Sequence, residues 1–174
     1  MKTSSAADKI QANLQDLFKA KLASGDAYIR FQLTSDMTAL LSMEQVQESI
    51  VIAAEKITPL PGMPESAIGI MNSRDRVFCV FDLAGLLTLS SGFISPRQYQ
   101  VIVLQTNSEK PIYIGLAVTR IQGMVRLATE KINSSLDTCS SKITPYLLGV
   151  VKEEETAISV LDFNRISEHL SKIS

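Results

Sequence analysis

Histidine and tryptophan are almost missing from this sequence, which has one histidine, His169, and no tryptophan. A Ser-His-Asp or Cys-His site needs a histidine beside a nucleophile, and no nucleophile motif accompanies His169. Metal sites usually combine several histidine or cysteine ligands, and none cluster along this chain. Glycine-rich phosphate-binding motifs are also missing. We therefore expect no catalysis and no bound metal or cofactor.

The sequence also has little net charge and no long apolar run. With 17 basic and 18 acidic residues, its net charge is −1, so it has no long-range field to collect nucleic acid or anionic lipid. No apolar stretch approaches the roughly 20 residues of a membrane-spanning helix, and the N-terminus lacks the apolar core of a secretory signal. Cys79 and Cys139 are the two cysteines, best explained as free thiols. We predict a cytoplasmic protein without direct membrane insertion.

A helical pattern is present at the start of the chain. Residues 1–25 differ from the rest, because apolar side chains recur there every three or four residues with polar residues between them. This apolar stripe consists of Ile10, Leu14, Leu17, Phe18 and Leu22. The spacing predicts an amphipathic helical extension over 1–25. The remaining 26–174 is long enough to bury a core without disulfides or metals.

From residue 26 onward the apolar pattern has the period of β-strands. Short runs are separated by Pro, Gly, Ser and Asn, which favours small barrels or a sandwich. The runs are 28–33, 37–43, 46–52, 77–81, 99–105, 112–119, 121–127, 147–151 and 157–161. The tail from Asn164 to Ile173 has helical spacing, with Asn164 as the expected N-cap. We predict a mostly β domain that ends in a helix.

An internal repeat is the most informative feature. Residues 69–83 and 149–163 both read as glycine, a short strand, a polar turn, an apolar strand, aspartate and an apolar residue, at an offset of 80 positions. A second similarity relates 42–47 to 117–122, and a strand that begins with tyrosine precedes each. Two copies of one β module in tandem explain these similarities, although apolar strands also resemble one another by chance. We predict two barrels with 69–83 and 149–163 in equivalent positions.

Three titratable residues are the only candidates for chemistry. Asp82 and Asp162 occupy matching places in the two copies, but a cap on the short helix that follows each strand explains them better than a carboxylate pair. His169 lies near Ile166 on the expected C-terminal helix, where half-exposed packing explains it. An enzyme that uses Asp82, Asp162 or His169 is therefore the weakest hypothesis. A nucleic-acid-binding or other small β-barrel binding module is a stronger alternative, although stacking aromatics are few.

Residues 57–83 resemble the CheW domain, and the resemblance extends over roughly 26–170. Typical features of that domain are a proline-spaced segment, a Gly-apolar-apolar-Asn-x-Arg-Gly turn and a strand that ends in Asp-Leu. The matching stretches here are Ile57 to Pro64, Gly69 to Arg74, Val77 to Leu83, the Val-x-Glu-like Gln45 to Glu48, Gly115 to Val118 and Leu148 to Val150. The family implies two small SH3-like five-stranded β-barrels packed around a shared core, with no catalytic activity.

The resemblance also implies a function. CheW proteins are chemotaxis adaptors that couple a methyl-accepting chemoreceptor or photoreceptor to the regulatory domain of a CheA-type histidine kinase in two-component signal transduction. The N-terminal extension and the stretch from Asp26 to Phe31 resemble coupling proteins of cyanobacterial phototaxis and type IV pilus motility. We therefore expect a non-enzymatic adaptor with these protein partners and no nucleic acid.

The resemblance assigns candidate receptor-binding residues. Val46 and Glu48 match the Val-x-Glu segment, Arg74 matches the turn arginine, and Ile121 and Met124 would face the same cleft if the repeat is symmetric. An aliphatic floor with charges at its rim suits a helical receptor tip. Plain core packing for Val46 and a solvated turn for Arg74 remain the alternative explanations.

The sequence departs from the family in the turn itself. Asp75 stands where the family has glycine, which removes easy access to positive φ, although aspartate tolerates that conformation better than most residues. Ser49 follows the Val-x-Glu segment where an apolar residue is usual. These changes indicate a divergent branch of the family.

Overall fold

The computed structural model of the protein describes residues 25–93, 96–134 and 142–173. The predicted apolar stripe over residues 10–22 and Cys139 lie outside the described residues. The strands are β1 Asp26–Thr34, β2 Met37–Ser42, β3 Val46–Ala53, β4 Ala67–Ser73, β5 Arg76–Asp82, β6 Gln98–Gln105, β7 Tyr113–Val118, β8 Arg120–Leu127, β9 Leu147–Glu153 and β10 Thr156–Leu161. The helices are α2 Leu83–Leu86 and α3 Phe163–Ile173, with 3-10 turns η1 Ala54–Lys56, η2 Thr129–Lys131 and η3 Thr144–Tyr146.

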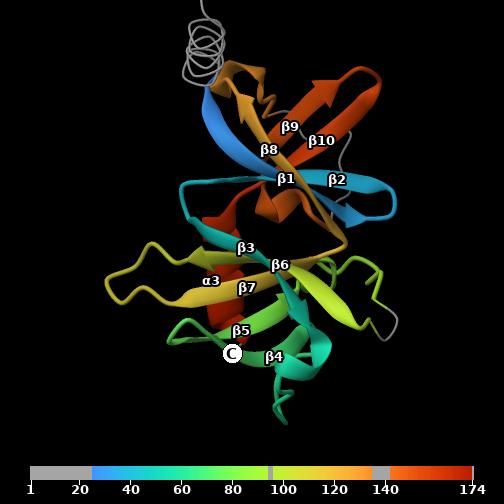
Figure 1. Cartoon of the computed structure of the whole chain (residues 1–174). Coiled ribbons are helices and arrows are strands. Elements are labelled where there is room, and N and C mark those ends of the chain that lie inside the picture. Colours follow the sequence, from blue (N-terminus) through green and yellow to red (C-terminus); the bar gives the residue numbers. More distant parts are fainter. Residues whose placement is uncertain (1–24, 94–95, 135–141, 174) are drawn as a thin grey trace, which may run out of the picture.

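These strands form two curled five-stranded sheets, which confirms the predicted mostly β, two-barrel fold. Barrel A has the strand order β8-β1-β2-β10-β9, and barrel B has the order β3-β6-β7-β5-β4. Each barrel contains one parallel pair, β10 with β2 in barrel A and β5 with β7 in barrel B, among antiparallel pairs. Figure 1 shows barrel A above barrel B, with α3 running down from barrel A alongside barrel B.

The predicted repeat is present in this topology. Strands β1 to β5 and β6 to β10 follow the same path, so the segments 69–83 and 149–163 occupy equivalent positions. Gly69 lies against the carbonyl oxygen of Thr58, and Gly149 lies against that of Asn133; an added Cβ would be 2.4 or 2.6 Å from that oxygen. In both places, glycine allows two backbone segments to approach closely.

Each barrel nevertheless draws on both copies of the repeat. Barrel A combines β1 and β2 of the first copy with β8, β9 and β10 of the second, and barrel B combines the complementary strands. The bulges match, because Gln47 in β3 and Gln122 in β8 are both extra residues in their ladders. The two tyrosines do not occupy equivalent positions of the repeat. Tyr28 pairs with Val125 in β8, and Tyr99 pairs with Ile52 in β3, which is two positions away from the equivalent of Val125.

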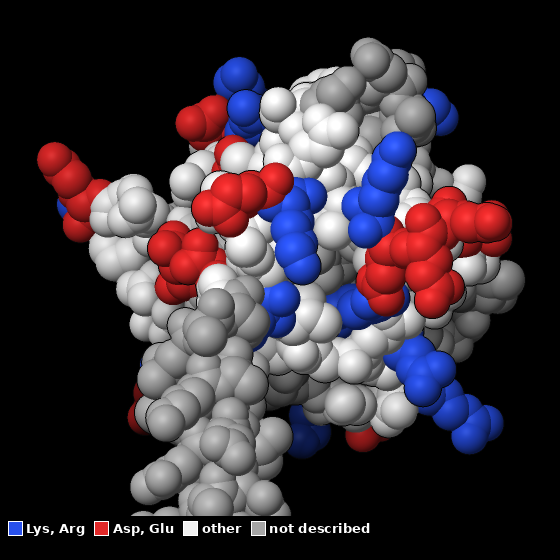
Figure 2. All heavy atoms as spheres, turned by 90° about the horizontal axis from the view of Figure 1, so that it is seen from above, with Lys and Arg blue, Asp and Glu red and all other residues white. Residues whose placement is uncertain are grey.

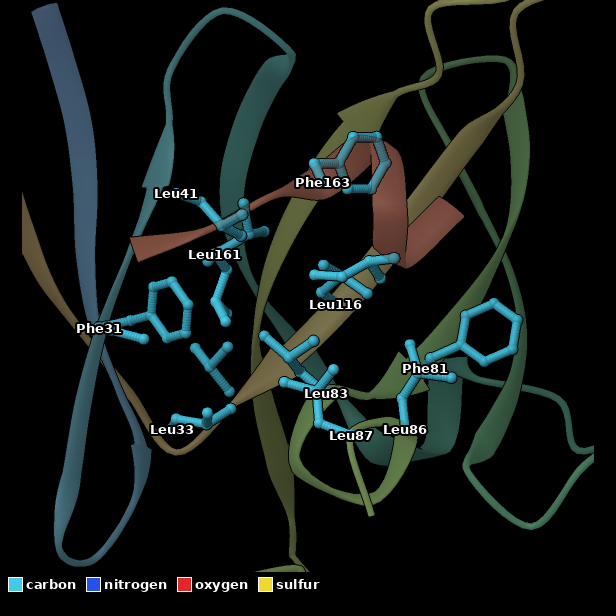
Figure 3. Packing of buried hydrophobic residues seen from close by; sticks show 14 of the residues in the cluster. Phe31, Leu33, Leu41, Phe81, Leu83, Leu86, Leu87, Leu116, Leu161 and Phe163 are labelled. Atoms are coloured by element: carbon cyan, nitrogen blue, oxygen red, sulfur yellow. The ribbon is translucent and has the colours of Figure 1, made fainter. Parts of the chain in front are cut away.

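The largest hydrophobic core lies between the barrels and joins them. Its members come from both sheets and both helices, and Figure 3 shows Phe31 and Leu41 facing the side chains of Leu83 and Leu116. These four side chains are completely buried, as is Ile166 of α3. Burying a side chain of this size stabilises the folded state by about 1.5–3 kcal/mol. Since this core spans the junction, the two barrels support each other.

The helix ends differ from the sequence prediction in two respects. Asp162 Oδ1 accepts a hydrogen bond from the backbone N–H of Asn164 at 3.0 Å, so Asp162 caps α3 as expected. The prediction of Asn164 as N-cap is wrong, because the helix already begins at Phe163. Asp82 stands at the N-cap position of α2 but makes no side-chain cap hydrogen bond.

Candidate functional site

The start of β3 carries two of the predicted receptor-binding residues. Val46 is half-buried and packs against the core between the barrels. Glu48 lies after the bulge at Gln47, and its side chain is only 14% exposed. Alternation along the strand leaves Gln47 and Ser49 exposed. Val46 is therefore in part a core residue, and the inward side of β3 carries an acidic group next to an aliphatic one.

The turn between β4 and β5 brings Arg74 to the same place. Arg74 and Asp75 have φ values of 50° and 64°, as in a two-residue type I′ hairpin turn, and the flanking Ser73 and Arg76 are paired. Here the turn forms without the glycine of the family pattern. Arg74 Nη1 lies 3.3 Å from Glu48 Oε2, while the arginine side chain remains 79% exposed. Two residues that the sequence nominated separately thus form one ion pair across barrel B.

The two candidates in the second half of the chain lie in different surroundings. Ile121, at the start of β8, is half-buried and packs against the same central core as Val46. Its backbone N–H donates to Gln100 Oε1 at 2.7 Å. Met124 is 50% exposed and belongs to none of the core clusters of the described residues. Ile121 therefore packs against the core between the barrels, as Val46 does, whereas Met124 stands on the outer surface of barrel A.

Barrel A has a matching ion pair that the sequence prediction missed. Arg30 Nη1 donates to Glu153 Oε2 at 2.7 Å, and Arg30 Nε donates to Gln122 Oε1 at 3.1 Å. Arg30 stands directly opposite Gly123, the repeat equivalent of Glu48. Gly123 itself lies in open space, because an added Cβ would meet no atom within 4 Å. The spacing between Arg30 and Glu153 gives no sequence signal, because the contact depends on the pairing of β1 with β8.

A polar hollow of about 310 Å³ adjoins the start of β3. It is rich in carboxamides and is lined by Glu44, Gln45, Gln47, Gln105, Thr106, Asn107 and Asn164. Gln45 Nε2 donates to Asn164 Oδ1 at 2.9 Å, which ties the loop before β3 to α3. Sequence reasoning missed this hollow, because Asn164 is far from the other lining residues along the chain.

The three residues of the enzyme hypothesis take part in separate local contacts. Asp162 is paired with Arg165 at 3.4 Å, and His169 stacks edge-on against Tyr146 with ring centroids 5.4 Å apart. Burial and the negative charge of Asp82 raise the pKa of the Tyr99 hydroxyl. The polar hollow beside β3 is lined by none of Asp82, Asp162 and His169. The contacts of Asp162 and His169 explain these two residues as parts of the fold around α3.

Comparison with known proteins identifies the family. Residues 27–171 match the family model of the CheW-like domain. The chain belongs to the CheW-like domain family. Among the described residues, no helix has the length and apolar character needed to cross a membrane. The matched range includes both barrels and α3, so family membership applies to the whole fold described above.

Individual relatives agree with this membership. The chain is 30% identical to "Chemotaxis protein CheW" of Thermotoga maritima over 122 residues, which cover 70% of this chain and 76% of the relative. It is 26% identical to "Protein PilI" of Pseudomonas aeruginosa over 107 residues, or 60% of this chain and 57% of the relative. The crystal structure of scaffolding protein TtCheW from Thermoanaerobacter tengcongensis has the same fold, with a TM-score of 0.68 and 18% identity over 82% of this chain and 92% of that one. The chain is thus similar both to a chemotaxis CheW protein and to PilI.

Proposed function

We propose that this protein is a non-enzymatic adaptor that couples a methyl-accepting-type receptor to the regulatory domain of a CheA-type histidine kinase. Membership of the CheW-like family supports a scaffold or coupling role. The similarity to PilI favours an array that controls pilus-based motility, with chemotaxis and phototaxis as the related outputs. Such an adaptor acts in the cytoplasm and needs no cofactor.

The receptor surface in this proposal consists of Val46, Glu48, Arg74 and Ile121, with Met124 as an outlying contact. The observation that carries it is the Arg74–Glu48 ion pair. Glu48 is mostly buried and holds the guanidinium in place, while 79% of the Arg74 side chain remains accessible to a partner. Val46 and Ile121 supply aliphatic surface at the junction of the barrels. An apolar stripe with charged flanks on a receptor helix would complement this surface.

The test compares Arg74→Ala with Arg97→Ala, which removes the same charge from an exposed position just before β6. Binding of each full-length variant to a receptor-tip fragment and to the kinase regulatory domain is measured by calorimetry. We expect Arg74→Ala to weaken receptor binding about tenfold, as for the loss of a contact worth roughly 1.4 kcal/mol. Kinase binding should persist, and the melting temperature should change little, because the arginine is largely exposed.

Three results would contradict this assignment. A large fall in melting temperature would mean that Arg74 mainly stabilises barrel B through Glu48. An equal loss of receptor binding in Arg97→Ala would mean that only net charge matters. Failure of the wild-type chain to bind either partner would contradict the adaptor function itself.

A further inference from the structure

An apolar groove of about 620 Å³ lies between α3, β5 and the loop that connects β6 to β7. Val77 and Ile112 at its edge are 66% and 59% exposed, which is unusual for large aliphatic side chains. Cys79 and Leu170 contribute to its walls. Groups of apolar side chains exposed together on a folded protein commonly mark a docking surface. The receptor surface proposed above does not include any of these residues.

The equivalent place in barrel A is closed by the chain itself. The backbone N–H of Asp82 donates to the carbonyl of Ser66 at 2.8 Å, and Asp162 donates to that of Tyr146 at 2.7 Å, so the two approach segments correspond. In the same correspondence, Met63 beside the groove is the equivalent of Ile143. Ile143 is 1% exposed and belongs to the central core.

Exposure along the two equivalent strands reflects this difference. Ser159 in β10 is 6% exposed, whereas its equivalent Cys79 in β5 is only half-buried and lines the groove. Burial raises the pKa of the Cys79 thiol. Barrel B therefore leaves an apolar groove open, with Met63 half-buried in its wall, whereas the equivalent Ile143 of barrel A is inserted in the core. The missing occupant should be apolar, and it should come from outside the described part of the chain.

The apolar stripe of residues 10–22 matches that chemistry, but it cannot reach the groove of its own molecule. Only Ala23 and Ser24 separate Leu22 from Gly25, a connection of at most about 10 Å. β1 has nine residues and is about 30 Å long, and its end rather than its start approaches barrel B, where Thr119 donates to the carbonyl of Gln32. Figure 1 shows the start of β1 at the top and the end of α3 at the bottom.

The stripe itself is too short to span the separation between the start of β1 and the groove. As a helix, the thirteen residues from 10 to 22 would extend about 20 Å, so with the connection they would reach back only to the junction of the barrels. A stripe of five large apolar side chains needs a cover. We propose that residues 10–22 of one copy of the chain dock in the groove of a second copy, which gives a dimer by reciprocal exchange.

The experiment measures the self-association of the full chain by sedimentation velocity over a concentration series. Val77→Asp places a charge in the groove, and Val51→Asp is its control, because Val51 is 62% exposed on β3 of the same sheet and lies outside the groove. Leu17→Asp places a charge in the stripe, and Gln15→Asp is its control on the polar side of the same pattern. We expect Val77→Asp and Leu17→Asp each to weaken the dimer tenfold or more, and both controls to leave it unchanged.

A covalent crosslink identifies the partner chain. In a Cys139→Ser background, Leu14→Cys is oxidised with copper phenanthroline, and a disulfide to Cys79 of the other copy should give a product of dimer size. Cys79→Ser should abolish this product. A crosslinked product of monomer size would show docking within one chain and would overturn the proposal.

Several other outcomes would overturn it as well. These are a wild-type chain that stays monomeric at every concentration, a dimer that survives Val77→Asp, or a dimer that Val77→Asp weakens and Leu17→Asp does not. Binding of the receptor tip should persist in Val77→Asp, and the dimer should persist in Arg74→Ala. Failure of this inference and failure of the adaptor function can therefore be distinguished.

Discussion

The two barrels follow the same strand path, and in each an ion pair joins the hairpin to another strand. The charge carried by the hairpin residue is positive in barrel B and negative in barrel A. In barrel B the β4–β5 hairpin supplies the arginine, Arg74, and β3, the strand at the other end of the sheet order, supplies Glu48. In barrel A the hairpin supplies Glu153, and β1 supplies Arg30. Glu48 in barrel B and Gly123 in barrel A occupy the same position of the repeat, and Arg30 is paired directly opposite Gly123. The two barrels thus place an ion pair in related positions with the charges exchanged between hairpin and strand.

The difference between the pairs lies in what each leaves exposed. The Arg30 side chain is 30% exposed and has a second partner in Gln122. In barrel A the cation is therefore the more buried member of the ion pair, and Glu153 is the more exposed one. Figure 2, which looks down on barrel A, shows acidic side chains gathered at its edge beside basic ones. Barrel B does the opposite, because Glu48 is mostly buried and Arg74 extends into solvent. Only barrel B offers an accessible guanidinium at its hairpin, which is why the receptor contact is proposed there.

The largest effect on this comparison should come from the two equivalent glycines. Gly69→Ala and Gly149→Ala place a Cβ 2.4 and 2.6 Å from a backbone carbonyl oxygen, closer than non-bonded atoms approach, and overpacking of this kind costs about 1–3 kcal/mol. Gly69→Ala should cost more, because Gly69 also has a φ of +157°. Urea unfolding measures both, with Gly92→Ala as control, since its Cβ would meet only Thr119 Oγ1 at 3.6 Å. A neutral Gly149→Ala would show that barrel A does not depend on the same contact as barrel B.

A smaller effect is expected at the hairpin turns, where the barrels differ in backbone conformation. Both central residues of the β4–β5 turn have positive φ, whereas in the β9–β10 turn only Glu154 does, with φ 55°. Glu154→Gly should stabilise the protein by up to about 1 kcal/mol, because a left-handed conformation costs an ordinary residue roughly that amount. Glu155→Gly removes the same charge at an ordinary φ and should be mildly destabilising instead. Equal effects of both changes in thermal unfolding would mean that charge, not backbone strain, limits this turn.

The smallest effects concern the ion pairs themselves. Double-mutant cycles with Arg30→Ala and Glu153→Ala, and with Arg74→Ala and Glu48→Ala, measure each coupling free energy by urea unfolding. We expect about 0.5–1 kcal/mol for Arg30–Glu153, which is shorter and supported by Gln122, and less than about 0.5 kcal/mol for Arg74–Glu48. Added salt should reduce both. A stronger coupling for Arg74–Glu48 would reverse the comparison and weaken the case for a receptor-contacting Arg74.

Much of the fold could be predicted from the sequence, because it depends on local pattern. Alternation of apolar residues identified the described strands except β4 to within a few residues of their observed ends, and β4 was recognised only through the repeat. The spacing after Leu161 identified α3. The sequence offered both Asp162 and Asn164 as caps of α3, since both are good capping residues, and only the backbone geometry selects Asp162. The residues of the candidate site were nominated one at a time, and the contact between Glu48 and Arg74 could not be foreseen from spacing.

The sequence by itself determined that the chain has two copies of one β module, with glycine where the backbone approaches another segment and polar residues at the hairpin turns. The tertiary structure alone decided that each barrel takes strands from both copies. Strands of the two copies carry the same alternating pattern, so pattern cannot choose between pairing within a copy and pairing across copies. The parallel pairs β2–β10 and β5–β7, and the core that buries Phe31 against Leu83 and Leu116, resolve that choice through contacts between distant parts of the chain.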